Sequence, residues 1–220
     1  MTEYRADEML AVVEIMKGLN EKNIAELQTL GLDFTGKLNV NEIHYMGHSF
    51  GGATALHAAR RVQPKSIIAH EPAADWLPDD SRASLYDINR MKDSPFNYTY
   101  WHVPLPSRTN ETSDEGEHGV SIHDMDLLVL WSHEWVEKQW GGANILKEMH
   151  ERGVVGRSGG VSRVDIVDGA HHNEFSDTCM LTPLWLARSS GLTGSRNPLD
   201  TALEIHMRTV DFLEDLRQKQ

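Results

Sequence analysis

The chain has 220 residues, 40% hydrophobic and 25% charged, a composition typical of a globular protein rather than a disordered or fibrous one. Its 21 basic and 33 acidic residues give a net charge of −12, which argues against binding to nucleic acid or simple docking on anionic membranes. One cysteine, Cys179, cannot form an internal disulfide. We expect one domain over residues 1–220, and we favour a cytoplasmic location because the charged N-terminus does not resemble a signal peptide.

Predicted helices and strands alternate along most of the chain. Apolar spacing predicts a helix over residues 3–19, a weaker one over 23–30 and then a polar loop to 41. The predicted strands cover 41–46, 66–70, 126–132 and 162–169. Further predicted helices cover 53–62, 143–153 and 199–216. Residues 78–118 are predicted to be irregular. This alternation predicts an α/β protein with a mostly parallel sheet, whose ligands bind at the carboxyl ends of the strands.

The segment "YMGHSFGGAT" carries the strongest chemical signal. Residues 47–51 match the pattern G-x-S-x-G between a predicted strand and a predicted helix, as a nucleophile elbow requires. Such a turn is strained and exposes the hydroxyl of its serine, here Ser49. The flanking glycines are expected where the strand and helix backbones approach closely. The backbone N–H of Phe50 is then one natural donor to an oxyanion.

A serine nucleophile needs a base, and an acid that orients the base. Of the 12 histidines, the pair His171 and His172 follows the last predicted strand, where this arrangement needs its base. Three carboxylates at strand ends compete for the acid, and the residues alone leave the choice open: Glu71, Asp75 and Glu134.

Three segments in order resemble the platelet-activating-factor acetylhydrolases of the plasma and type II intracellular kinds. They are "GHSFGGAT" at 47–54, "SIIAHEPAADWLP" at 66–78 and "VDIVDGAHHNEFSD" at 164–177, and the likeness extends over nearly the whole chain. The resemblance implies an α/β-hydrolase fold and a Ca²⁺-independent serine esterase. Its implied substrates are phospholipids with short or oxidised sn-2 acyl groups.

By position, the resemblance implies Ser49 as nucleophile, His172 as base and Glu71 as acid, with Phe50 in the oxyanion hole. The family normally has aspartate at the acid position, so the longer glutamate must adjust its geometry. Asp75 is kept as the alternative acid. The alternative functions are a broader carboxylesterase or lipase, or an inactive hydrolase fragment.

The elbow comes early in the chain, and the residues before its strand predict only helices and loop. The first strands of the fold, which would carry the second oxyanion donor, are therefore expected to be missing. Losing one such donor costs about 10²–10³ in rate. We accordingly expect an N-terminally shortened hydrolase that aggregates or has weak activity when expressed alone.

Two aromatic segments, 94–106 and 179–192, could contact a lipid surface or pack on the sheet, and packing is the preferred interpretation. No cofactor is expected. No metal is expected either, because the chain has neither H-E-x-x-H nor paired cysteines.

Overall fold

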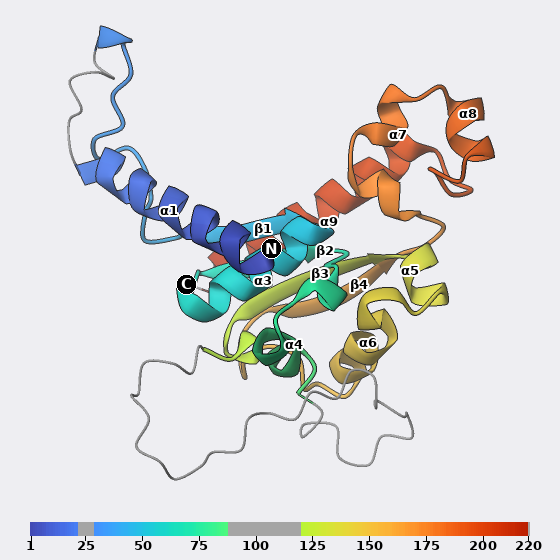
Figure 1. The fold of residues 1–220 in the computed structure, drawn as a ribbon, viewed down its shortest axis with the longest axis horizontal. Helices are drawn as coiled ribbons and strands as arrows, with labels where there is room; N and C mark the ends of the chain where they lie inside the picture. The colour runs from blue at the N-terminus through green and yellow to red at the C-terminus, as the bar shows by residue number, and fades with distance from the viewer. Residues whose placement is uncertain (22–28, 88–119, 220) are drawn as a thin grey trace.

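The computed structural model describes residues 1–21, 29–87 and 120–219 (Figure 1). In these ranges the chain forms a four-stranded parallel sheet in the order β1-β2-β3-β4. The strands are β1 (His44–His48), β2 (Ser66–His70), β3 (Asp126–Ser132) and β4 (Ser162–Val167). Every residue of the two central strands is buried, because helices cover both faces of the sheet.

The two faces of the sheet carry separate apolar cores. Successive side chains of a strand point to opposite faces, so Ile67 joins one core and Ile68 joins the other. The first core packs under α1 (Thr2–Glu21), α3 (Phe50–Arg61) and α6 (Ala143–Glu151). The second packs under α9 (Pro198–Gln218), which lies across the opposite face (Figure 1). The α/β class predicted from the alternating pattern is therefore confirmed.

Short helices connect these elements. They are η1 (Ala74–Trp76), α4 (Asp79–Leu85), η3 (Ile122–Asp124), α5 (His133–Glu137), η4 (Trp140–Gly142), η5 (His172–Phe175), α7 (Thr178–Leu181) and α8 (Leu184–Ser189). None of the described helices is both long enough and apolar enough to cross a membrane.

The predicted elements agree closely with the structure at the buried strands and less well at the turns. The strands predicted at 66–70 and 126–132 have the observed bounds. The helix predicted at 53–62 begins earlier, at Phe50, because Gly51 and Gly52 belong to its first turn. The irregular prediction for 78–118 is wrong at α4, where Asp79 and Asp80 in the first turn favour a helix. Most of the helix predicted at 23–30, and the aromatic segment 94–106, lie outside the described residues.

No strand precedes β1 within the described residues, so β1 lies at an edge of the sheet. Met46, in the middle of β1, is correspondingly exposed.

Candidate active site

Ser49 stands alone between β1, which ends at His48, and α3, which begins at Phe50. Its backbone has φ 55° and ψ −119°, a conformation that non-glycine residues rarely adopt and that stores strain. Two backbone hydrogen bonds hold it there. The Ser49 N–H donates to the His70 carbonyl at 2.9 Å, and the Ala73 N–H donates to the Ser49 carbonyl at 3.0 Å. The turn is therefore tied to the end of β2.

Close packing explains two of the three glycines around this turn. A Cβ on Gly47 would overlap the backbone of Gly51, and one on Gly52 would lie 3.0 Å from the Cα of Pro72. By contrast, a Cβ on Gly51 would meet nothing within 4 Å. The expectation that both flanking glycines are needed because the backbones approach closely is thus wrong for Gly51, where a side chain would point into open space.

The candidate oxyanion donor is the N–H of Phe50. This is the first residue of α3, where a helix leaves its N–H groups without intrahelical acceptors. The Phe50 ring packs edge-on against Trp76, with centroids 6.1 Å apart, which holds the start of the helix. Within the described residues, no earlier strand precedes β1 to supply a loop with a second donor.

Glu71 follows β2 directly and is completely buried. Its Oε2 accepts a hydrogen bond from His172 Nδ1 at 2.6 Å, and its Oε1 accepts one from the Ser132 N–H at 2.7 Å. Burial alone would raise the pKa of this carboxyl, but the hydrogen bond from His172, the nearby His48 ring and the hydrogen bond from Ser132 together outweigh it and lower the pKa. Glu71 therefore stays ionised beside the imidazole. Its own φ of 46° is a second strained backbone position.

His172 begins η5, shortly after β4, and is held from three sides. Its ring donates to Glu71, and it stacks on the indole of Trp135 at 4.8 Å between centroids and 18° between planes. Its backbone N–H donates to Glu134 Oε2 at 3.1 Å. Because Nδ1 carries the proton given to Glu71, Nε2 is left free to accept one. Among the described residues, no hydrogen bond joins Ser49 Oγ to this ring.

The other candidates for base and acid lie elsewhere. His171 turns away, and its Nδ1 donates to the Gly191 carbonyl at 3.1 Å. Asp75 is exposed in η1. Glu134 contacts the backbone of His172 rather than its ring, and its second oxygen accepts from Lys138 at 2.7 Å. The geometry therefore pairs Glu71 with His172.

Sequence reasoning assigned no role to three neighbours of this pair. His48, in the elbow, lies with its ring 4.7 Å from that of His172 and stacked on Phe175 at 5.9 Å. Trp135 had no signal beyond its position after β3. Glu174 is buried and accepts from the His171 N–H at 2.7 Å and from Thr193 Oγ1 at 2.6 Å, which anchors the segment that carries His172.

A cavity of about 290 Å³ lies beside the site, between α9 and the strands β1 and β2. Phe175 belongs to its wall and also packs on the rings of His48 and His70. Burial lowers the pKa of His70 to about 4, so this histidine is uncharged at neutral pH. Ser49 is not among the residues that line the cavity.

The chain is an α/β-hydrolase. Its parallel sheet leads through a strained serine into a helix, and a buried acid–histidine pair lies at the same end of the sheet. Residues 3–110 match the family described as platelet-activating factor acetylhydrolase, isoform II. This match supports assigning the chain to that family, which at the family level is one of phospholipid esterases. The matched range includes Ser49 and Glu71, whereas His172 lies beyond it. A search of curated proteins found no match.

Proposed function

We propose that this chain is a serine esterase that removes short or oxidised sn-2 acyl groups from phospholipids, with Ser49, Glu71 and His172 as its catalytic residues. The observation that carries the proposal is the strained turn at Ser49, with φ 55° and ψ −119°, in a chain of this family. Backbone strain of this kind is retained at functional sites because it aims a reactive group. The buried pair of Glu71 and His172, 2.6 Å apart, adds support.

In each half-cycle of the proposed reaction, His172 acts first as a base and then as an acid. His172 Nε2 takes the proton of Ser49 Oγ as that oxygen attacks the ester carbonyl, and the Phe50 N–H stabilises the oxyanion. Glu71 remains ionised and stabilises the imidazolium without taking its proton. His172 then gives the proton to the leaving alcohol, and water repeats the sequence to release the acyl group. Glu71 takes the place of the family's usual aspartate.

Contact with a lipid surface is part of the proposal. The segment that follows His172 forms α7 and α8, and Trp185 there is 73% exposed. The preferred interpretation from sequence, that this aromatic packs on the sheet, is therefore wrong for Trp185. Four other exposed apolar residues of the two helices are Met180, Leu181, Leu184 and Leu186. Exposed apolar groups in one short segment favour contact with lipid.

The test is covalent labelling by a fluorophosphonate probe, which reacts with activated serines. We expect the wild-type chain to be labelled and Ser49→Ala to show no labelling. Glu71→Gln should label far more slowly, since loss of the acid in related triads lowers kcat by about 10⁴. Asp75→Asn is the matched control and should label at the wild-type rate. Persistent labelling of Ser49→Ala would refute the assignment.

One observation favours a second candidate, a hydrolase core with little or no turnover. The described residues offer Phe50 but no second oxyanion donor from a loop after an earlier strand. If this candidate is correct, the wild-type chain will resist the probe. Comparing turnover of an acetyl-phospholipid with that of a simple aryl ester then separates a phospholipid esterase from a broader carboxylesterase.

A further inference from the structure

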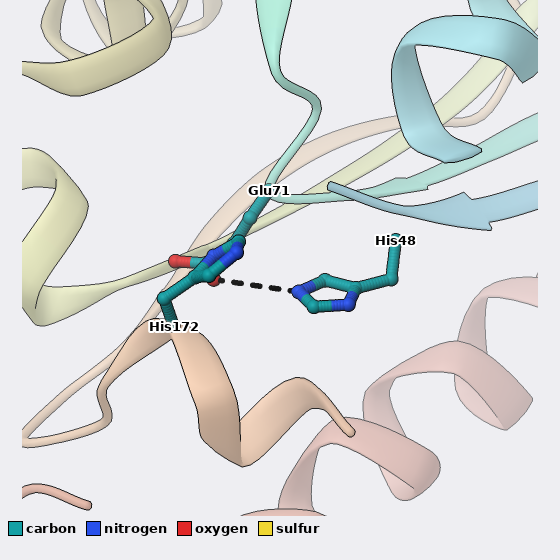
Figure 2. Close-up of side chains that lie close together, drawn as sticks. All are labelled: His48, Glu71 and His172. Atoms are coloured by element: carbon teal, nitrogen blue, oxygen red, sulfur yellow. Dashed lines mark hydrogen bonds and ion pairs between the residues drawn. The ribbon is translucent and has the colours of Figure 1, made fainter. Parts of the chain in front are cut away.

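The His48 ring lies beside the proposed catalytic pair, and the proposed reaction gives it no role. Its Nε2 is buried and has no hydrogen-bond partner. It points at Glu71 Oε2 from 3.9 Å, too far for a hydrogen bond, and that same oxygen accepts from His172 Nδ1 (Figure 2). One nitrogen of each ring and one carboxylate oxygen all lie within 4.8 Å of one another.

Two imidazole nitrogens and one carboxylate oxygen are the donor set of three-ligand zinc sites, which keep a fourth position open. Tetrahedral bonds of 2.0–2.1 Å place neighbouring ligand atoms about 3.3 Å apart. The distances from Glu71 Oε2, 2.6 Å to His172 and 3.9 Å to His48, lie on either side of that value. These two distances need to change by about 0.7 Å, and the distance between the two imidazole nitrogens, at most 4.8 Å, needs to shorten by up to about 1.5 Å, which rotation of the two histidine side chains can supply.

The surroundings hold these ligand atoms in place before any ion arrives. Phe175 stacks on His48, Trp135 stacks on His172, and the Ser132 N–H fixes the other oxygen of Glu71. Groups that orient ligands in this way raise metal affinity. The rings of His48 and His172 also lie close to solvent, since their side chains are 26% and 24% exposed.

We propose that His48, Glu71 and His172 form an inhibitory Zn²⁺ site. When zinc bonds to His172 Nδ1, the hydrogen bond to Glu71 breaks and the Nδ1 proton passes through water to Nε2, so the ring stays neutral. A nitrogen that carries this proton cannot accept the one from Ser49. Zinc thus removes the base from the site. The inhibition, though not the binding, rests on the proposed function.

Binding is tested without activity, in the Ser49→Ala chain titrated with Zn²⁺ by calorimetry. We expect one site per chain. Adding His48→Gln should weaken it at least about tenfold, and His48→Phe, which keeps the stacked ring but loses the nitrogen, should do the same. His133→Gln, at an exposed histidine outside the cluster, should leave the affinity unchanged. Absence of a stoichiometric site, or full affinity in both His48 variants, overturns the proposal.

Inhibition is tested by probe labelling of the chain with Ser49 intact at increasing Zn²⁺. We expect labelling to fall as the site fills, and the half-inhibiting concentration to rise at least about tenfold in His48→Phe, each protein compared with its own zinc-free rate. Full labelling at saturating zinc overturns the inhibitory role. If the chain never labels even without zinc, the proposed function fails, and the calorimetry still decides whether the site exists.

Discussion

Single atoms decide whether the turn at Ser49 can form. Gly47, near the end of β1, lies against the backbone of Gly51, and Gly52 lies against Pro72 after β2, so both must lack a side chain. Gly51 lies on the open side of the first turn of α3 and has an ordinary φ. The same residue type therefore has different roles at neighbouring positions.

This difference gives a matched pair of variants. Gly47→Ala should destabilise the chain by at least about 1–3 kcal/mol, the usual penalty of overpacking, and abolish probe labelling because the turn must open. Gly51→Ala should be neutral or stabilise by up to about 1 kcal/mol, since alanine favours a helix. Urea unfolding and labelling check both. Equal effects of the two substitutions would contradict the packing argument.

At the scale of elements, α9 fixes the second face of the sheet. Asn197 caps its start by accepting from the Leu199 N–H at 2.9 Å, and Phe212 and Leu216 bury its apolar side. Glu204 on this helix accepts from Arg196 at 2.5 Å and from Arg208 at 2.6 Å. Burial alone would raise the pKa of Glu204, but the two arginines outweigh it and lower the pKa.

A carboxyl group whose pKa is lower in the folded chain than in the unfolded chain stabilises the fold at pH values above the unfolded pKa of 4.5. This stabilisation is lost as the pH falls through the lower pKa of the folded chain. Glu204→Gln should therefore lower the free energy of unfolding by ~1 kcal/mol at pH 7 and by much less near pH 3. Denaturant unfolding at both pH values measures this. Glu214→Gln, a carboxylate on the same helix, serves as the control. A deficit in Glu204→Gln that is equal at the two pH values would contradict the linkage.

At the scale of the whole molecule, the described sheet has an uncovered edge. β1 pairs with β2 alone among the described strands, and Met46 on it is 54% exposed. An exposed apolar edge strand invites pairing with another chain. We also propose that residues 1–220 form one domain, because both apolar cores share the strands of a single sheet.

The free edge predicts self-association that grows with protein concentration. Met46→Lys should reduce it, since a charged side chain on an edge strand opposes pairing. Met207→Lys is the matched control, as that methionine is also 54% exposed but lies on α9. Light scattering after size exclusion measures the mass. A concentration-independent monomer, or an equal effect of both lysines, would contradict the role of the edge.

Local pattern was enough to predict the central strands, the long helices and the turn at Ser49. A short, mostly apolar run such as 126–132 favours a buried strand in a chain of alternating elements, and an elbow is built from consecutive residues. Short helices such as α4 and α5 were missed because tertiary contacts, rather than apolar periodicity, stabilise them.

The relation between distant side chains required the folded molecule. Glu71, Asp75 and Glu134 all follow strands, and sequence spacing could not say which lies against a histidine 101 residues beyond Glu71. Parallel pairing in register brings the carboxyl ends of β2, β3 and β4 to the same end of the sheet. There Glu71 contacts the His172 ring, whereas Glu134 contacts only the backbone of His172. The convergence of His48 on the same carboxylate oxygen had no sequence signal, because side-chain direction at a strand end depends on the three-dimensional packing around it.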